Sequence, residues 1–509
     1  MATKLPVIAA SVLLFSFVAP SAHASYVQQG AKLVGTGAVG TLVQQGYSVA
    51  VSGDGNTAIV GGSYDNNGEG AAWVYTRIAG VWSQQGAKLV GTGAVGAANQ
   101  GSSVALSADG NTAIVGGPAD SSYAGASWVF TRSAGVWSQQ GAKLVGTDAV
   151  NRNGVNQGYS VSLSSDGNTA LVGGDEDNGA AGAAWVYRRS GGVWSQQGAK
   201  LVGTGAVVAA NQGSSVALSA DGSTAIVGGP VDNLFAGAAW LYTGSGGGWS
   251  QQGAKLVGSG AAGNASQGNS VALSADGSTA VVGGYSDNSS AGAAWVFTGS
   301  AGVWSQQGTK LVAADAMSPA FQGYSVSVSA DGNTAVVGGD RDDSYAGAAW
   351  VYTRSAGVWS QQGSKLIGTG AAGAAYQGAS VSVSADGNTA VVGGFYDNNG
   401  VGAAWVFVNA SPTSVNDEGS LVFALERVRP NPTNGSSLNV AFALPSGASA
   451  RLELMDISGR RVLSREVGSM GVGRHSVNLA GGRKISPGLY WIRLTQGANQ
   501  RVARVAVIE

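Results

Sequence analysis

Residues 100–117, QGSSVALSADGNTAIVGG, and residues 125–144, GASWVFTRSAGVWSQQGAKL, decide the fold, because the same pattern recurs along most of the chain. Its W-x-Y/F tract returns in steps of 55 or 57 residues. The tryptophans of these tracts are Trp73, Trp128, Trp185, Trp240, Trp295, Trp350 and Trp405. Self-similarity at a fixed period of this length is typical of solenoids and propellers.

Each unit contains four short stretches with the pattern of a strand. Residues 103–107 alternate, Asp109-Gly110 signals a tight turn, and residues 112–115 form a second apolar run. A polar loop leads to a third strand at residues 128–130, and a short turn leads to the WSQQGAKL strand. Four strands per period, repeated seven times, predict an all-β, seven-bladed β-propeller over residues 25–409.

The two ends of the array predict a closed ring. The chain carries a copy of the WSQQGAKL strand at residues 26–34, and the last unit stops near Val408 without one. The first strand can therefore complete the last blade, whereas a linear solenoid would need capping repeats.

Composition and the amino terminus narrow the class of protein. The 509 residues contain no cysteine and carry a net charge of −1, which excludes disulfides and thiol nucleophiles and gives no reason to expect a nucleic-acid partner. Residues 1–24 have the charged start, short apolar run and A-x-A end of a secretory signal peptide. We therefore expect a secreted or cell-surface protein without a transmembrane span in the mature chain. His475 would be its one remaining histidine, too few for a two-histidine metal centre.

The unit resembles the FG-GAP repeat of integrin-α-type propellers. Residues 46–49 correspond to the FG half and residues 70–75 to the GAP half, and the resemblance covers all seven units. The double glycine followed by tryptophan is also similar to kelch repeats, which form the same architecture. The unit departs from the FG-GAP family at the calcium loop, where the family's acidic run is shortened to a turn with one carboxylate, such as Asp54.

Two rows of aspartates recur in every unit. Because Ca²⁺ takes six to eight oxygen ligands, we expect the single aspartate of each Asp-Gly turn to shape the turn rather than bind calcium. The second row lies in the loop between the second and third strands, where an aspartate can fix the loop by accepting backbone N–H bonds. No cofactor is expected, apart from a weak candidate calcium site in two acid-rich loops. Its residues are Asp175, Asp177, Asp340, Asp342 and Asp343.

The loops between the second and third strands vary most among the units, and in a propeller they emerge on the same face as the blade linkers. Variation on one face of a rigid frame is typical of a binding surface. Aromatic rings amid aspartates could stack on sugars or anchor a protein, or could pack the loops on one another. The candidate binding-face residues are Tyr64, Asp65, Tyr123, Asp120, Phe235, Asp232, Tyr285, Asp287, Tyr345, Asp342, Tyr396 and Asp397.

Composition changes after a polar linker at residues 410–420. Residues 421–509 hold 12 Lys and Arg against 5 acids, and their alternating segments predict a small immunoglobulin-like β-sandwich. This region is similar to the type A sorting domain of the type IX secretion system, which implies export across the outer membrane with that machinery as partner. A sandwich without a sorting role is the alternative. The residues that carry the resemblance are Pro430, Asn431, Pro432, Gly459, Arg460, Gly488 and Tyr490.

These observations predict an exported, non-enzymatic recognition or adhesion protein whose partner is a glycan or a surface protein. A secreted glycan-acting enzyme would need two loop carboxylates about 5 to 10 Å apart, a distance that a sequence does not give. A structural surface-coat component is the third alternative.

Overall fold

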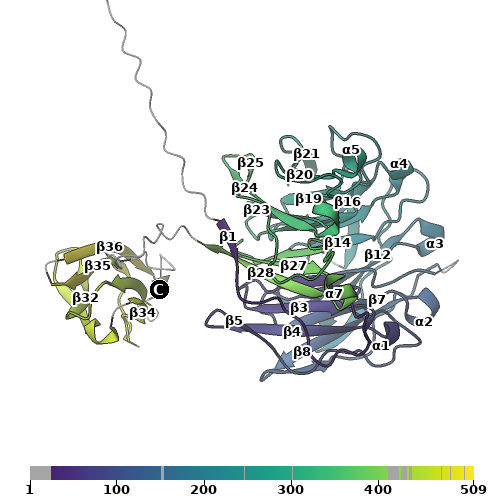
Figure 1. Cartoon of the computed structure of the whole chain (residues 1–509). Helices are drawn as coiled ribbons and strands as arrows, with labels where there is room; N and C mark the ends of the chain where they lie inside the picture. The colour runs from purple at the N-terminus through teal and green to yellow at the C-terminus, as the bar shows by residue number, and fades with distance from the viewer. Residues whose placement is uncertain are drawn as a thin grey trace, which may run out of the picture. The chain divides into compact units, whose positions relative to one another are not determined.

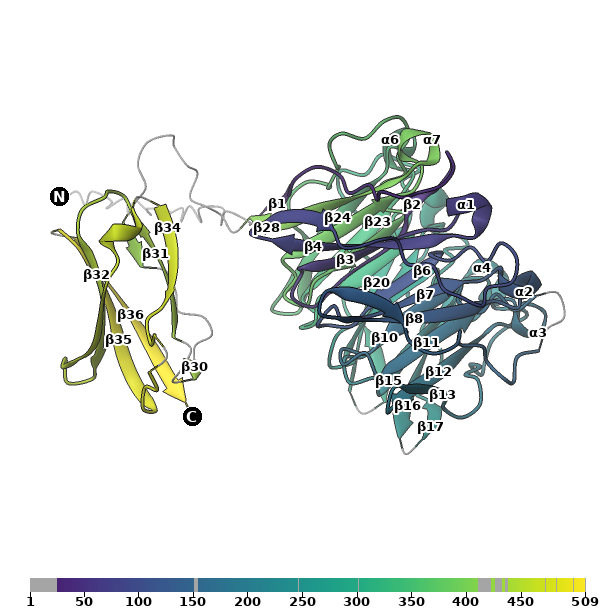
Figure 2. The same ribbon diagram turned by 90° about the horizontal axis from the view of Figure 1, so that it is seen from below.

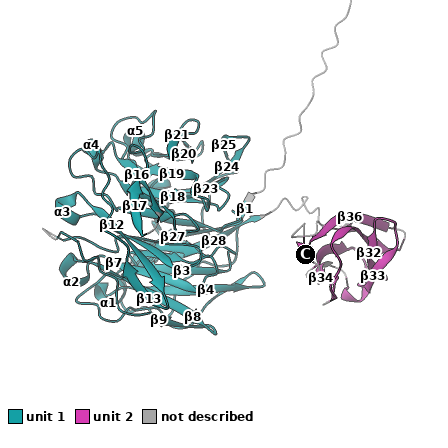
Figure 3. Cartoon of the chain, turned by 180° about the vertical axis from the view of Figure 1, so that it is seen from behind, with its two compact units in different colours: residues 1–412 teal, residues 413–509 magenta. Residues whose placement is uncertain are grey.

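The computed structural model describes residues 25–150, 154–245, 247–300, 302–410, 423–425, 433–434, 438–471, 473–481, 483–497 and 499–508. The chain divides into two compact units, Met1–Pro412 and Thr413–Glu509 (Figure 3). The predicted signal peptide at residues 1–24 and residues 411–420 of the predicted linker lie outside the described residues. No helix of the described segments is long and apolar enough to cross a bilayer.

The first unit consists of seven four-stranded antiparallel sheets, which confirms the predicted seven-bladed propeller (Figure 1). We number the blades in chain order. The innermost strands are β2 (Gln45–Val51), β6 (Ser103–Leu106), β10 (Ser160–Leu163), β14 (Ser215–Leu218), β18 (Ser270–Leu273), β22 (Ser325–Val328) and β26 (Ser380–Val383). The second strands are β3 (Thr57–Gly62), β7 (Thr112–Gly117), β11 (Thr169–Gly174), β15 (Thr224–Gly229), β19 (Thr279–Gly284), β23 (Thr334–Gly339) and β27 (Thr389–Gly394).

The outer half of each blade contains a long and a short strand. The third strands are β4 (Ala71–Ile78), β8 (Ala126–Ser133), β12 (Ala183–Ser190), β16 (Ala238–Ser245), β20 (Ala293–Ser300), β24 (Ala348–Ser355) and β28 (Ala403–Ala410). The outermost strands are β5 (Val81–Gln84), β9 (Val136–Gln139), β13 (Val193–Gln196), β17 (Gly248–Gln251), β21 (Val303–Gln306), β25 (Val358–Gln361) and β1 (Ser25–Gln28). These strands are shorter than the WSQQGAKL pattern predicts. After Gln139 the chain turns at Gly141, where φ is +74°, and only Leu144 bridges back to the sheet.

The ring is closed in two ways. β1 pairs with β28, so the first strand completes the seventh blade as predicted (Figure 2). At the Asp-Gly turns, a backbone N–H of each blade donates to a carbonyl of the next, from Gly53 through Ala108 and onward to Ala385, whose N–H donates to Gly53 at 3.0 Å. These seven backbone bonds form a continuous circle.

The core lies between neighbouring blades. Trp128 is fully buried against blade 1, and its indole N–H donates to the Thr92 carbonyl at 2.8 Å. The double glycine is required by close packing on both sides. A Cβ on Gly117 would lie 2.8 Å from the Trp128 indole ring, and a Cβ on Gly116 would lie 2.1 Å from the Gly158 carbonyl oxygen of the next blade. The tryptophan row therefore packs blade on blade and marks no cofactor site.

Single helical turns connect the second and third strands. They are α1 (Asp65–Gly68), α2 (Asp120–Tyr123), α3 (Asp177–Ala180), α4 (Asp232–Phe235), α5 (Asp287–Ser290), α6 (Asp342–Tyr345) and α7 (Asp397–Gly400). The two central residues of each turn have positive φ. Figure 1 shows α1 to α5 following one another along an arc, so they belong to one face of the propeller.

The second unit is a β-sandwich. One sheet contains β29 (Ala424–Leu425), β31 (Asn439–Leu444) and β34 (Gly473–Asn478). The other contains β30 (Thr433–Asn434), β36 (Asn499–Ile508), β35 (Gly488–Gln496), β32 (Ala450–Asp456) and β33 (Arg461–Glu466), and the 3-10 turn η1 (Gly468–Met470) follows β33. Alternate residues of both sheets, among them Phe442, Leu452 and Ile492, form one buried core.

Candidate functional site

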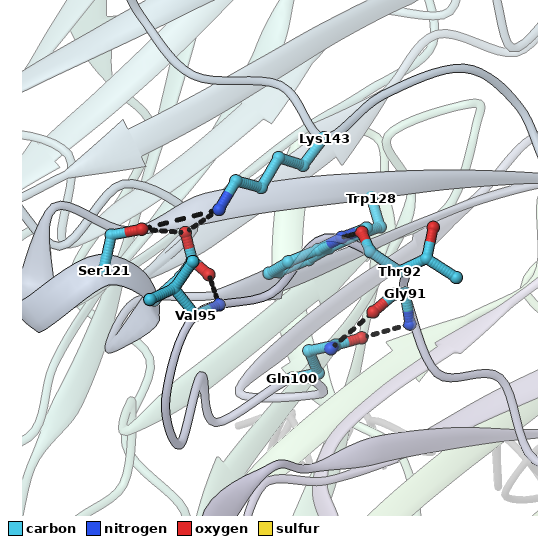
Figure 4. Close-up of polar contacts among 8 residues, drawn as sticks. Gly91, Thr92, Val95, Gln100, Ser121, Trp128 and Lys143 are labelled. Carbon is cyan, nitrogen blue, oxygen red and sulfur yellow. Dashed lines mark hydrogen bonds and ion pairs between the residues drawn. The ribbon is translucent and has the colours of Figure 1, made fainter.

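A buried ion pair holds each loop of the variable face. In blade 2, Asp120 accepts from Lys143 Nζ at 2.5 Å and from the Val95 backbone N–H at 2.8 Å (Figure 4). Asp120 is 1% exposed. Gln100 adds a clamp, because its side-chain amide accepts from the Gly91 N–H and donates to the Gly91 carbonyl.

The same pairing occurs in every blade. The other pairs are Lys88 with Asp65, Lys200 with Asp177, Lys255 with Asp232, Lys310 with Asp287, Lys365 with Asp342, and Lys32 with Asp397. The prediction that this aspartate row contributes to an exposed binding face is therefore wrong, since each carboxylate is buried and paired. The corrected residues are Asp65, Asp120, Asp232, Asp287, Asp342 and Asp397.

The Asp-Gly turns carry a local hydrogen-bond network. Asp109 accepts from the Ser107 hydroxyl at 2.5 Å and from the Asn111 backbone N–H at 2.9 Å. Burial opposes ionisation, but these bonds and the nearby Arg132 together lower the pKa of Asp109. Both carboxylate oxygens of Asp109 thus accept hydrogen bonds from the turn itself, as the sequence predicts.

A cavity of about 560 Å³ opens on the variable face, at the inner ends of the blades. One residue from each blade lines it, the x of the Q-G-x-S tract. These residues are Tyr47, Ser102, Tyr159, Ser214, Asn269, Tyr324 and Ala379. Burial and the neighbouring Asp175 raise the pKa of Tyr159, and burial raises that of Tyr324. Both hydroxyls therefore stay protonated and able to donate hydrogen bonds.

An aromatic arc borders this cavity on blades 5, 6, 7 and 1. Its members are Tyr47, Tyr285, Phe321, Tyr324, Tyr345, Tyr376, Phe395 and Tyr396. Tyr376 lies at its centre, with ring centroids 5.2 Å from Tyr345, 5.1 Å from Phe395 and 5.7 Å from Tyr396. The Arg341 guanidinium stacks 4.0 Å from the Phe321 centroid and joins the two halves of the arc.

Several aromatic residues of this face have a left-handed backbone conformation, with positive φ, which is strained for a bulky residue. Tyr123, Phe235 and Tyr345 have φ between +68° and +71°, at a position where Gly68 and Gly400 occur in sister blades. Phe321 and Tyr376, with φ of +57° and +56°, take the position of Asn99, Asn156 and Asn211. Left-handed backbone costs a bulky residue about 1 kcal/mol, whereas glycine and asparagine tolerate it. The fold alone would favour those small residues.

The structure brings some of the predicted aromatics together and not others. Tyr285, Tyr345 and Tyr396 belong to the aromatic arc, and Tyr64 and Tyr123 line the cavity. Phe235 is 52% exposed and stands apart from both groups. The sequence interpretation missed Tyr47, Tyr159 and Tyr324. The sequence pattern could have identified them, because each occupies the variable position x of the Q-G-x-S-V tract, whose other four residues are the same in every blade.

Two buried carboxylates accompany the site, at matching positions in blades 3 and 6. Asp175 is 8% exposed, lines the cavity and accepts from Asn156 Nδ2 at 3.1 Å. Asp340 is 4% exposed, and its Oδ1 has no hydrogen-bond partner in the described structure. Burial raises the pKa of each to about 6, an effect that Arg341 partly offsets at Asp340.

The Asp340→Asn variant should be more stable than the parent at pH 8. A folded-state pKa above the ordinary 3.8 means that ionisation opposes folding, so the destabilisation is absent at low pH and complete above pH 6. We expect a gain of about 2 kcal/mol at pH 8 that shrinks at pH 4, measured by denaturant unfolding. Asp109→Asn is the matched control and should lose stability at pH 8. An equal effect of Asp340→Asn at both pH values would contradict the assignment.

The candidate calcium loops do not assemble as a metal site. Asp177 and Asp342 are paired with lysines, and within the described segments no three acidic or histidine side chains gather in a group that could hold a metal ion. The other candidates, Asp175 in blade 3 and Asp340 and Asp343 in blade 6, belong to two separate loops, and calcium binding at either loop stays a prediction.

The sorting-motif residues of the second unit occupy turns and a strand. Gly459 has φ +83°, and Arg460 Nε donates to Asp456 at 3.0 Å in the turn between β32 and β33. Tyr490, two residues after Gly488 on β35, donates its hydroxyl proton to the Ser486 carbonyl at 2.8 Å. Pro430, Asn431 and Pro432 lie outside the described residues.

Solved structures resembling the chain are remote. They include the periplasmic gluconolactonase of Pseudomonas aeruginosa (20% identity, 64% of this chain, 85% of that chain, TM-score 0.42). Kuenenia stuttgartiensis hydrazine synthase also matches (12% identity, 74% of this chain, 99% of that chain, TM-score 0.46). So does a fungal alcohol oxidase in complex with copper (15% identity, 94% of this chain, 100% of that chain, TM-score 0.45). No curated protein matches the chain. Similarity at this level carries no functional argument.

The family comparison concerns the second unit. Residues 427–509 match the secretion system C-terminal sorting domain. The match starts three residues before Pro430, the first of the sorting-motif residues, and runs to residue 509. It confirms the sorting-domain interpretation and implies export to the cell surface or the extracellular space. The C-terminal unit therefore belongs to the secretion system C-terminal sorting domain family, and the type IX secretion machinery is the partner that this family implies.

Proposed function

We propose that the chain is an exported, non-enzymatic recognition protein whose propeller, built from FG-GAP-like repeats, binds a glycan at the aromatic arc and the adjoining cavity. In this proposal residues 1–24 serve as the signal peptide, and the immunoglobulin-like C-terminal module directs the propeller through the type IX system. Adhesion of the cell or of the released protein to a glycan-bearing surface follows from such binding.

The observation that carries the proposal is the strained backbone under the rings. Four aromatic residues of the arc and the cavity occupy left-handed positions, namely Tyr123, Phe321, Tyr345 and Tyr376. Sister blades without a ring there have glycine, serine, alanine, asparagine or glutamine. Because the same backbone forms with those residues, the loops do not require the rings. Strain that persists in this way clusters at functional sites.

The chemistry of the surface favours a sugar. The faces of pyranose rings carry C–H groups that stack on aromatic faces, and their hydroxyls need donors and acceptors nearby. Tyr345 and Tyr396 are each 42% exposed and offer such faces. The cavity beside them presents the Asn99, Asn211 and Asn269 amides and the Asp175 carboxylate.

Glycan hydrolysis is the alternative function for the same surface. A hydrolase needs two carboxyl groups that flank one bond, which places them within about 10 Å. Asp175 and Asp340 come from different blades, 3 and 6, and the charged neighbour of Asp175 is Glu176 of its own loop. As a ligand group, Asp175 would accept hydrogen bonds from sugar hydroxyls.

The double variant Tyr345→Ser, Tyr396→Ser should lose binding while keeping its melting temperature within a few degrees. Both changes copy blade 5, where Ser290 has φ +69° and Ser286 precedes the loop aspartate, so the backbone is preserved. The measurement pairs a binding isotherm with thermal unfolding.

Phe235→Ser is the matched control, because Phe235 shares the backbone position and exposure of Tyr345 but lies outside the arc. It should bind normally. A loss of stability in the double variant equal to its loss of binding would reassign the tyrosines to loop packing.

The experiment that tests the function is a screen of the full-length chain on a glycan array and on whole cells, with calcium and with EDTA. We expect saturable binding that EDTA leaves unchanged. Binding that EDTA abolishes would contradict the assignment of the site to the aromatic arc. Absence of binding to both the array and the cells would refute glycan recognition.

A further inference from the structure

A cleft at the outer edge of the blades is filled by an arginine in four of them. In blade 2, Arg132 Nε donates to Asn111 Oδ1 at 2.9 Å, and Nη1 donates to Gln85 Oε1 at 2.9 Å. Its guanidinium also lies 5.4 Å from the centroid of the Trp137 ring. An amide from the Asp-Gly turn, an amide from the preceding blade and an indole face thus form one receptor for a guanidinium.

The receptor repeats with the same parts. Arg77, Arg189 and Arg354 each contact an asparagine of their own turn, a glutamine of the preceding blade and a tryptophan of their own outer strand. The tryptophan N–H shares the glutamine oxygen, as between Trp137 and Gln85 at 3.1 Å. Four independent copies show which chemical group the cleft accepts.

Two blades lack the arginine and its turn partner together. Blade 4 has Gly244 and Ser223, and blade 5 has Gly299 and Ser278, where four other blades have arginine and asparagine. Blade 7 also lacks the arginine, which is replaced by Asn409, but it keeps the turn asparagine as Asn388. The glutamine and the tryptophan stay, as Gln252 and Trp304 in blade 5. The loss removes the occupant of the cleft but keeps these residues of its walls. The Trp304 ring lies over Gly299, where an added Cβ would be 2.3 Å from it, and the Gln252 side-chain amide donates to the Thr243 hydroxyl at 2.7 Å.

The cleft of blade 5 is open. A cavity of about 410 Å³ is lined by Thr224, Gln252, Asp276, Ser278 and Trp304, the counterparts of the groups around Arg132. In blade 4 the corresponding cavity is about 110 Å³, and Arg188 is among its lining residues at the position that Thr243 takes in the blade 5 cleft. The blade 5 cleft is therefore the roomier of the two.

The charge of the open cleft suits a cation. In the filled blades the guanidinium lies close enough to the turn aspartate to lower its pKa, as Arg132 does for Asp109. In blade 5 the Asp276 carboxylate lines the cavity instead, and hydrogen bonds from Ser274 and Ser278 keep its pKa low despite burial. Asp276 therefore presents its negative charge to whatever enters.

We propose that the blade 5 cleft is a docking site for the guanidinium of an arginine side chain supplied by another protein. The four filled clefts define the occupant, and Gln252, Trp304 and Asp276 are the groups that would hold it. The site lies at the outer edge of the ring, so it is separate from the aromatic arc, and its occupation does not depend on glycan binding.

The test uses the full-length chain and N-acetyl-arginine-N-methylamide as probe, observed by saturation-transfer NMR and calorimetry. The citrulline analogue, which is neutral and nearly isosteric, and the lysine analogue serve as control probes. We expect the arginine probe to bind about tenfold more tightly than either, because only a guanidinium combines a positive charge with planar donors and a face that stacks on indole. The citrulline group is planar but uncharged, whereas the lysine ammonium is charged but not planar. Equal binding of the citrulline probe would overturn the proposal.

Two double variants test the site by changing the protein. Gly299→Arg with Ser278→Asn rebuilds a filled cleft, moves the Trp304 ring off the glycine, and should abolish the probe signal while raising the melting temperature. Arg354→Gly with Asn333→Ser empties the blade 6 cleft and should add a binding site. Probe binding that survives in the filled variant would refute the site.

The same filled variant identifies the source of the arginine. If sedimentation shows that the parent chain self-associates and the filled variant does not, a second copy supplies the side chain. If both stay monomeric and only probe binding is lost, the arginine comes from a different protein.

Discussion

Deletion of residues 421–509 should leave the propeller in the periplasm of the producing cell. The deleted region contains the whole sorting-domain match at residues 427–509, and the propeller closes its ring through β1 and β28 without it. Folding and export are therefore separable, and we expect extracellular protein to fall to background while periplasmic protein accumulates. Fractionation and immunoblotting measure both pools.

A reporter fused to residues 421–509 is the matched control, and it should reach the cell surface or the medium when it also carries a signal peptide. Normal export of the truncated chain would refute the sorting role. Failure of the truncated chain to accumulate anywhere would instead indicate proteolysis, which a thermal melt of the purified truncation resolves.

Replacement of Lys143 by methionine should destabilise the propeller by about 3 kcal/mol. The change leaves the Asp120 carboxylate, 1% exposed, with the Val95 N–H and the Ser121 hydroxyl but no countercharge. Removal of one partner of a buried ion pair is strongly destabilising because the remaining charge stays desolvated. Tryptophan fluorescence during denaturant unfolding reports this unit, since 13 of the 14 tryptophans lie in it.

The double variant Lys143→Met, Asp120→Asn separates charge from packing. Asparagine keeps an acceptor for the Val95 N–H and removes the unpaired charge, so the double variant should be more stable than Lys143→Met alone. Additive losses would show that the lysine acts through packing and that the ion pair contributes nothing.

The fold was predictable because its signal is periodic and local. The 55-residue step, the Asp-Gly turns and the copy of the outer strand at residues 26–34 each reflect one blade, and the ring follows from counting them. The outer strand was overestimated because Gly141, at positive φ, ends it, and a single glycine in a strand pattern is compatible with continuation.

The polar contacts could not be predicted, because they join residues of different loops. Lys143 and Asp120 are 23 residues apart and belong to two rows that are constant in every blade. Constancy alone does not show that two rows meet, so the sequence interpretation assigned the aspartates to the surface. The structure shows that the two rows pair with each other and that the aspartates are buried.

The candidate site depends even more on closure of the ring. Tyr47 and Phe395 lie 348 positions apart in the numbering, yet their ring centroids are 5.7 Å apart in the structure. The variability of the Q-G-x-S position marks the residues that line the cavity, but only the geometry shows that they converge there.

Amide hydrogen exchange with and without the best oligosaccharide from the array tests the central claim most directly. We expect protection at residues 321–324, 340–346, 376–379 and 394–400, which carry most of the aromatic arc, and none at the Asp-Gly turns near residues 53–56 or 108–111. Protection confined to those turns, or spread evenly over all seven blades, would contradict recognition at the aromatic arc.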